Sequence, residues 1–465
     1  MDRSLTGPVK RSNAQAVAVP IGGCLIAIFS VLSYYLLLSN PGYFSHDELQ
    51  WGARADVAHW RDLPWQAWTD FTAFQHRPLT FNLWLLIAYA WFEQPALMHL
   101  LWVAMGLFNA ALLFGCLKQL RATTLQSLGG AAAFAISPFA IYVHGWTATL
   151  ADLLWLAAAL ALLQSVLRLP TESRWRAAFI ALVFTSIGLL AKEAALAIAP
   201  LLLFAWLVLG RQPRLRAALM ASGAVTAGYL WLRLPTLLYA PRPEGTYAWS
   251  LSMPLKRWAE MQLYPYLPTA LEFASVSNAS TTRFGLALLI AVVVAATFVI
   301  ANRRIGATYL FGGAIAMGPP LVLAIGYPQY GYGYAALICG CGALAWPQLR
   351  ARGQSVLLLA LVLTSWHGYN IAREMHRIGA IQARYSPALA DAVSAHRSRH
   401  SDTSTALRLA LEVEADRGVF ERLSRQISNY AGVAIGDQVK LVDRQQTHHA
   451  VIGADGSIRW AAGAE

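Results

Sequence analysis

Charged residues are scarce in this chain of 465 residues. Asp, Glu, Lys and Arg make up 13% of the sequence, whereas 57% is hydrophobic and 17 residues are Trp. A soluble domain of this length needs more charge to cover its surface, so the composition excludes an ordinary soluble protein. It indicates a polytopic membrane protein with a small polar appendage.

Cysteines are also few. The four that occur all lie in apolar runs: Cys24, Cys116, Cys339 and Cys341. They form no C-x-x-C pair, which excludes a disulfide framework and a cysteine-based metal site. No small-residue cleavage site follows the first apolar run, 16–39, so we expect a retained membrane helix rather than a removed signal peptide.

The net charge of +12 does not indicate nucleic acid as a partner. Lys and Arg occur mostly in short clusters between apolar runs, which is typical of membrane topology signals. We therefore expect no nucleic-acid binding.

Eleven apolar runs are long enough to cross a bilayer. They are 16–39, 95–117, 124–143, 147–167, 175–191, 194–209, 216–238, 284–302, 305–327, 331–347 and 355–370. A twelfth run, 78–92, would cover about 22 Å as a helix, against a hydrocarbon core of about 30 Å.

The distribution of Lys and Arg decides the placement of 78–92. If this run does not cross, 15 basic residues share one side of the membrane and the longer connections opposite carry 8. The basic side comprises the N-terminus and the loops at 118–121, 168–176, 211–216, 303–304 and 350–352. The positive-inside rule makes that side cytoplasmic, so we predict eleven spans, with 78–92 in the outer interface and a short tilted span as its alternative.

Residues 371–465 are polar and are predicted to form a small α/β domain outside the membrane, after a transmembrane domain of residues 1–370. SPALADAVSAH and DRGVFERLSRQISNY have helical spacing. Strands are predicted in ALRLALEVE, VKLVD and HHAVIGADGSIRW, the last as a hairpin turning at Ala454, Asp455 and Gly456.

Two adjacent carboxylates follow the first predicted span, in GYFSHDELQW (42–51). Ser45 and Glu48 match a capping box, which is a purely structural role. The capping box needs only these two residues and therefore gives Asp47 no structural role. A carboxylate beside His46 at the membrane surface is suited to act as a general base toward a hydroxyl nucleophile.

Further candidates precede or follow other apolar runs. His76 and Arg77 stand before Pro78, where free N–H groups and positive charge suit a lipid-linked phosphate, although Pro78 is also good capping chemistry and Arg77 could snorkel to headgroups. His144 and Asp152 lie near the outer face. A carboxylate in an apolar helix indicates a function or a pairing with a neighbouring Arg.

The remaining candidates lie at outer turns. Lys192 and Glu193 form a charged turn that either marks the interface or reaches a phosphate. Arg257 is set among aromatic residues, which suits an interfacial belt or a groove for a sugar and an anionic headgroup. Tyr330 and Tyr332 belong to a tyrosine-rich turn that lines a sugar site or anchors the interface.

Four segments occur in the order found in the GT-C superfamily of membrane glycosyltransferases: HDEL, HRPLTFNLW, ISPFAIYVHGWTATLADLL and LLAKEAALAIAP. The chain resembles most closely the protein O-mannosyltransferases and the transmembrane, tetratricopeptide-repeat O-mannosyltransferases. The resemblance covers residues 16 to about 210 and extends beyond them only in layout. Tetratricopeptide repeats are absent.

The resemblance implies a GT-C-like, all-α transmembrane domain. It implies inverting transfer of a sugar from a polyprenyl-phosphate-linked donor to a hydroxyl of an extracytoplasmic acceptor. Asp47 takes the position of the catalytic base and Glu48 supports it, while Arg77 and Lys192 are placed near the donor phosphate. Asp152 matches a second acidic position.

Two positions depart from the pattern of these families. Leu150 replaces an Arg that they often carry shortly before the second acidic residue, and Tyr330-Gly331-Tyr332 stands where an Arg-Tyr pair is usual. We expect an enzyme that requires no cofactor, because polyprenyl phosphate is a good leaving group; a divalent metal is not indicated.

Two other functions remain open at this point. A polymerase or ligase of polyprenyl-diphosphate oligosaccharides would depend on basic residues more than on a carboxylate. A transporter of lipid-linked intermediates would need ionisable groups near mid-membrane and broken helices, for which Arg233 and Gly318-Pro319-Pro320 are candidates.

Overall fold

A computed structural model of the chain describes residues 13–57, 59, 61, 68, 70, 73, 75–239, 248, 250–267, 280–399 and 406–461. The basic N-terminal segment and large parts of the two long loops expected on the outer side lie outside the described residues.

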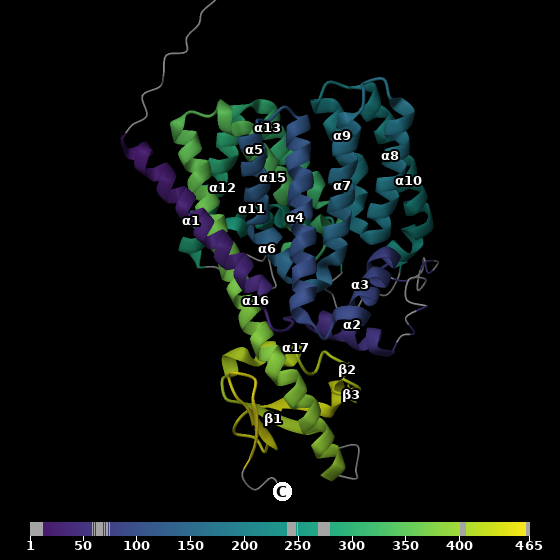
Figure 1. Ribbon diagram of the computed structural model, residues 1–465, viewed down its shortest axis with the longest axis vertical. Coiled ribbons are helices and arrows are strands. Elements are labelled where there is room, and N and C mark those ends of the chain that lie inside the picture. The colour runs from purple at the N-terminus through teal and green to yellow at the C-terminus, as the bar shows by residue number, and fades with distance from the viewer. Residues whose placement is uncertain are drawn as a thin grey trace, which may run out of the picture.

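Long helices form a bundle, and a small mixed domain lies at one end of it (Figure 1). Helices suit a membrane because each satisfies its own backbone hydrogen bonds. Large aromatic side chains from α3 to α6, among them Trp84, Trp102, Phe134 and Tyr142, are buried between the helices. The bundle helices are α1 (Asn13–Leu38), α4 (Pro95–Gln119), α5 (Thr124–Ala135), α6 (Pro138–Gly145), α7 (Leu150–Arg168), α8 (Arg174–Ala191), α9 (Ile198–Val208), α10 (Pro213–Tyr239), α12 (Thr281–Ala301), α15 (Tyr332–Ala345) and α16 (Ala351–Arg399).

Within the described residues, six helices are long and apolar enough to cross a membrane, or seven if the bent pair α5 and α6 counts as one span. They are Pro20–Leu38, Pro95–Gln119, Thr147–Arg168, Arg174–Ala191, Thr281–Ala301 and Ala351–Arg399. The chain therefore has the helices of a multi-pass membrane protein, but the eleven predicted spans are not reproduced as eleven such helices.

Local sequence explains several of the differences. The run 124–143 bends by 59°, because Pro138 starts a new helix that Ser137 caps by accepting a hydrogen bond from Ala140 N at 3.2 Å. The run 194–209 begins with a 3-10 turn (Glu193–Ala197), which leaves α9 with 11 residues.

The predicted span 305–327 is broken. It consists of α13 (Arg303–Ala307), a π-helical turn (Thr308–Gly312) and α14 (Gly313–Met317), which ends at Gly318. Gly318 has a φ of 58°, a conformation that side chains disfavour, and two prolines follow. Two 3-10 turns, Pro319–Val322 and Pro328–Gly331, then lead to α15, so the run 331–347 is a helix of 14 residues.

Figure 1 shows that the bundle has two different ends. One end of the bundle carries the basic loops. α1 and α16 start at that end, and α4 and α7 finish there. α2 (His46–Val57) and α3 (Pro78–Trp91) lie at the opposite end, next to the C-terminal domain. There α3 packs against α2, which is compatible with the interfacial location predicted for 78–92.

The C-terminal domain contains a four-stranded sheet of order β4-β1-β5-β6. β1 (Leu407–Leu411) runs parallel to β4 (Val439–Val442) and β5 (Ala450–Ile452), and β5 pairs antiparallel with β6 (Ile458–Trp460). The three predicted strand segments and the hairpin turn, where Gly456 has a φ of 87°, are thus present. The predicted boundary at residue 370 falls inside α16, a single helix of 49 residues that continues into this domain.

The remaining elements are short. In the C-terminal domain, α17 (Arg417–Arg422) is shorter than the helix predicted there, and β2 (Asn429–Tyr430) pairs with β3 (Val433–Ala434). α11 (Pro254–Leu263) precedes α12. The other 3-10 turns are Thr147–Thr149, Tyr264–Tyr266, Trp346–Gln348, Glu414–Asp416 and Gly436–Gln438.

Two cysteine substitutions test the two-ended arrangement. Glu172 lies between α7 and α8, Lys440 lies on β4, and both are exposed. In a variant without the four native cysteines, we expect Lys440→Cys to react with a membrane-impermeant maleimide on intact cells with an opened outer envelope. Glu172→Cys should react only after permeabilisation. Labelling of both from one side would contradict the arrangement.

Candidate functional site

The buried carboxylate of Glu48 holds the start of α2. Its Oε2 accepts hydrogen bonds from the N–H groups of Phe44 and Ser45, both at 3.0 Å. Its Oε1 accepts from the N–H and the hydroxyl of Thr147, at 2.8 and 2.6 Å. Burial raises the pKa of Glu48 to about 7, although these four donors act in the opposite direction. Glu48 is therefore a positioning residue that caps α2 and joins it to the break between α6 and α7.

The turn before α2 packs closely against α16 and is hydrogen-bonded to it. At Gly42 a Cβ atom would lie 2.4 Å from both Gly379 O and Gln382 Oε1, so only glycine fits there. Tyr43 N donates to Gln382 Oε1 at 2.9 Å, and His99 Nε2 lies 2.9 Å from Gly42 O. The start of α2 is thus fixed from the side of α16 as well.

Asp47 is far more accessible than its neighbour Glu48. Its side chain is 38% exposed, and its Oδ1 lies 3.3 Å from His46 Nε2. Desolvation raises the pKa of Asp47, while the charges of His46 and Arg77 lower it in part. An accessible carboxylate with a raised pKa is suited to take a proton from a substrate.

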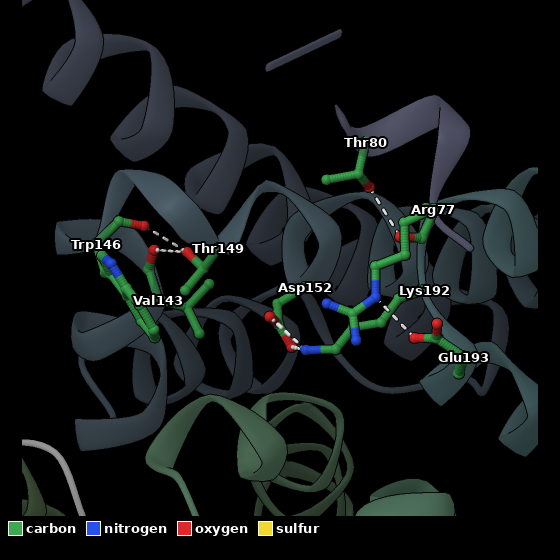
Figure 2. A network of polar contacts seen from close by, with 9 residues as sticks. Arg77, Thr80, Val143, Trp146, Thr149, Asp152, Lys192 and Glu193 are labelled. Atoms are coloured by element: carbon green, nitrogen blue, oxygen red, sulfur yellow. Dashed lines mark hydrogen bonds and ion pairs between the residues drawn. The ribbon is translucent and has the colours of Figure 1, made fainter. Parts of the chain in front are cut away.

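Arg77 stands at the N-terminal cap of α3, directly before Pro78. Its Nε donates to Glu193 Oε2 at 2.7 Å (Figure 2), and its charge also acts on Asp47. The hydroxyl of Thr80 donates to Ala191 O at 2.8 Å, which joins the first turn of α3 to the end of α8. This junction brings the Arg77 guanidinium to the Lys192–Glu193 turn.

Lys192 and Asp152 form a buried ion pair. The Lys192 Nζ lies 2.6 Å from both carboxylate oxygens, and the two side chains are only 6% and 4% exposed. Figure 2 shows this pair beside the Arg77–Glu193 pair. Tyr330 also belongs here, because its ring centroid lies 5.4 Å from the Lys192 Nζ. Asp152 therefore pairs with a neighbouring cation, which is Lys192 rather than an arginine.

Thr147 connects these helices. Its N–H and hydroxyl meet Glu48, and its carbonyl accepts a hydrogen bond from Trp84 Nε1 at 2.6 Å. The adjacent hydroxyl of Thr149 lies 2.7 and 2.6 Å from the carbonyl oxygens of Val143 and Trp146, which closes the break before α7 (Figure 2). α2 and α3 are thus both held by one residue at the start of α7.

The structure places two predicted substrate-binding residues elsewhere. His144 and Tyr332 are fully buried, with His144 Nε2 at 3.0 Å from the Tyr332 hydroxyl and Nδ1 at 3.2 Å from the Tyr34 hydroxyl. Asn109 Nδ2 donates to Tyr332 at 3.3 Å. They form a polar network inside the bundle, because α6 directs His144 toward α1 and α15.

Arg257 has a structural task. Its Nε donates to Leu323 O at 3.0 Å, a terminal nitrogen donates to Ala324 O, and the side chain is ion-paired with Glu260. The two carbonyls belong to the irregular segment after Gly318, where unpaired backbone groups would be costly at membrane depth. The substrate-binding role predicted for Arg257 gains no support from these contacts.

Arg233 is a residue that the sequence did not assign to this site. It is fully buried in α10, and its Nη1 donates to Ala73 O at 2.7 Å. Its charge acts on His76, which is also buried and also senses Glu193; desolvation lowers the pKa of His76. The sequence feature that could have pointed to Arg233 is an arginine within an apolar run. The sequence did not show, however, that α10 packs against α8.

We call Asp47, Arg77, Asp152, Lys192 and Glu193 the charged cluster. It combines an accessible carboxylate with two cations held by buried or half-buried carboxylates. Such a set can accept a proton and stabilise a developing anion. Across the described ranges, His, Cys, Asp and Glu form no group of three or more that could hold a metal ion.

No family model matches the chain, and no curated protein matches it significantly.

Substitution of the two adjacent carboxylates should separate their roles in stability. Glu48→Gln offers one acceptor oxygen to four donors, and a buried donor left unsatisfied costs about 1–3 kcal/mol, so we expect a clear fall in the thermal midpoint in detergent. Asp47→Asn should change stability by no more than about 0.5 kcal/mol, because that side chain is accessible. Equal midpoints for the two variants would contradict the positioning role of Glu48.

Proposed function

We propose that the protein is a GT-C-like glycosyltransferase of the bacterial inner membrane, with a cytoplasmic N-terminus and a periplasmic C-terminal domain. It transfers a sugar from a polyprenyl-phosphate-linked donor to a hydroxyl of an extracytoplasmic acceptor, which is a protein, lipid or polysaccharide. One observation carries this proposal: the accessible carboxylate of Asp47 and the cations of Arg77 and Lys192 lie at one end of a membrane-type bundle, where the charge of Arg77 acts both on Asp47 and on Lys192.

The reaction is a single displacement. Asp47 takes the proton of the acceptor hydroxyl while the oxygen of that hydroxyl forms a bond to the anomeric carbon of the sugar. The bond between that carbon and the phosphate oxygen breaks, and its electron pair leaves with the polyprenyl phosphate. Attack from the face opposite the phosphate inverts the anomeric configuration.

Arg77 and Lys192 stabilise the negative charge that grows on the leaving phosphate. Because they are ordered before the substrate binds, little reorganisation accompanies the reaction. Glu193 and Asp152 hold them in place and offset their charges where solvent is scarce. Glu48 acts through the position of α2.

The broken segment after Gly318 is the observation that bears on the transport alternative, since transporters use discontinuous helices. Its carbonyl groups are fixed by Arg257 and by the backbone, with Ser250 N donating to Val322 O at 2.8 Å. Hydrogen bonds fix this segment, whereas a transporter needs a segment that moves between two conformations. We therefore retain sugar transfer as the proposed function.

The proposed base is tested with the purified protein, radiolabelled polyprenyl-phosphate sugars and a cell-envelope extract as the source of acceptor. We expect Asp47→Asn to reduce transfer by roughly 10²–10⁴-fold, the usual contribution of general-base catalysis. The matched control is Asp56→Asn, which changes an exposed carboxylate on the same helix and should leave transfer intact. Full transfer by Asp47→Asn would rule out this assignment of the base.

The pH dependence of transfer provides a separate check. Asp47 must be ionised to act as a base, so kcat/KM should fall as the pH drops through its raised pKa. Arg77 lowers that pKa, and its removal in Arg77→Gln should therefore move the acid limb of the profile to higher pH, in addition to any loss of rate.

Arg54→Gln is the control for this profile, because it removes an exposed cation from the last turn of α2. We expect its acid limb to coincide with that of the unmodified protein. An unmoved limb in Arg77→Gln would show that the titrating group is not Asp47.

A further inference from the structure

Helix α15 separates two apolar cavities of the bundle. The first, which we call the α5 cavity, has a volume of about 480 Å³ and lies between α5, α6, α12, α15 and α16. The second, the α9 cavity, has a volume of about 350 Å³ and lies between α4, α7, α9, α13 and α15. Figure 1 shows α5, α12 and α16 on one side of α4, and α7 and α9 on the other. Both volumes fall in the range of about 300–1,000 Å³ that is usual for ligand sites.

Both cavities are long and apolar. Along α15 the α5 cavity extends from Ala335 to Ala343 and the α9 cavity from Gly333 to Leu344. These stretches of helix measure about 12 and 16 Å, a large part of a hydrocarbon core of about 30 Å. Among the described residues, Arg304 in the α9 cavity is the one charged residue that lines either of them. Such cavities fit hydrocarbon chains, because a polar ligand would lose its hydrogen bonds there.

The α9 cavity reaches the phosphate side of the charged cluster. Trp155 lines this cavity and stands three residues after Asp152 on α7, so the two side chains share a face of that helix. Asp152 in turn holds Lys192, whose Nζ lies 2.6 Å from both carboxylate oxygens. A hydrocarbon chain in the α9 cavity therefore has one end next to the Asp152–Lys192 pair.

The α5 cavity reaches the side of the proposed base. Phe139 lines this cavity and stands three residues before Tyr142 on α6. The Tyr142 ring packs edge-on against Phe44, with centroids 6.0 Å apart, and Phe44 precedes Asp47 by three residues. The charge of Asp47 also acts on Tyr142. A hydrocarbon chain in the α5 cavity therefore leads toward the base rather than toward the phosphate.

We propose that the acceptor is a lipid, and that its hydrocarbon chain occupies the α5 cavity while the polyprenyl chain of the donor occupies the α9 cavity. The inference rests on the proposed function and deepens it, because it selects one of three acceptor classes. In a single displacement, the acceptor hydroxyl and the leaving phosphate lie on opposite sides of the anomeric carbon. Chain sites on opposite sides of α15 meet this requirement, whereas a protein or polysaccharide acceptor has no chain to place in the second cavity.

Photoreactive lipids test the two chain sites without relying on activity. One probe is farnesyl phosphate with a diazirine at the far end of its chain. The other is phosphatidylglycerol, whose headgroup carries hydroxyls, with a diazirine in one acyl chain. Each is added to the full-length protein in detergent, and the labelled peptides are identified by mass spectrometry. We expect farnesyl phosphate to label α9, and phosphatidylglycerol to label α5 or α16.

Two glycines of α15 provide a matched pair of variants. Gly342 lines the α5 cavity and Gly340 lines the α9 cavity. Among the described residues, a Cβ atom at Gly342 would meet nothing within 4 Å, and one at Gly340 would have its nearest contact at 3.8 Å, so both positions have room for a side chain. Gly342→Leu should reduce labelling by phosphatidylglycerol about fivefold or more and leave labelling by farnesyl phosphate unchanged. Gly340→Leu should do the reverse.

Transfer by the unmodified protein then identifies the acceptor class. The cell-envelope extract is separated into an organic-soluble lipid fraction and a delipidated residue that holds proteins and polysaccharides. We expect the radiolabelled sugar to enter the lipid fraction, and Gly342→Leu to reduce this transfer. Transfer into the delipidated residue alone would overturn the inference and leave the proposed function standing, and so would labelling of one shared cavity by both probes. Transfer into neither fraction would refute the proposed function itself, and the inference with it.

Discussion

The hydrogen bonds accepted by Glu48 are the constraint on which this end of the molecule depends. A carboxylate with no exposed surface must be surrounded by donors, and here two come from the start of its own helix and two from Thr147. Because Trp84 of α3 donates to the carbonyl of the same threonine, α2 and α3 share one point of attachment. Asp47 and Arg77 therefore have a fixed relation, although 30 positions separate them in the chain.

Lys192 and Asp152, two further buried charges at this end, are paired for a related reason. A lone lysine or aspartate among apolar helices would lose its charge or draw in water, whereas the Lys192–Asp152 pair satisfies both partners with contacts of 2.6 Å. Pairing also fixes where each cation lies before any ligand arrives. Stability and readiness to bind an anion are consequently produced by the same contacts, since the pairs that offset desolvation also orient the cations.

The sequence allowed part of this to be predicted. Apolar length and the bias of Lys and Arg were enough to separate the two ends of the bundle, because both properties act through the bilayer rather than through packing. Capping chemistry separated Glu48 from Asp47, since a cap needs only residues that are near in sequence. The pairing of Arg77 with Glu193 spans 116 positions and was not predicted; the family resemblance placed only Arg77 and Lys192 near one donor phosphate.

Other features escaped prediction for equally physical reasons. An apolar run shows that a segment can enter a membrane but not that it forms one helix, so 305–327 was predicted as one span even though Gly318-Pro319-Pro320 was a candidate break. His144 and Tyr332 look like surface groups in sequence, yet helix direction turns them toward each other. Arg257 was predicted to bind substrate, although its side chain donates hydrogen bonds to backbone carbonyl groups more than 60 positions away in the chain.

The continuity of α16 alters how the two predicted domains are understood. One helix of 49 residues carries the Gln382 that accepts from Tyr43 and the Tyr385 that packs edge-on against Phe420, with ring centroids 4.9 Å apart. Gln50, one helical turn after Asp47, donates to Gln426 O in the C-terminal domain. The C-terminal domain therefore contacts α2 directly, and α16 fixes the turn before α2, so the helix of the proposed base lies at the junction of bundle and domain.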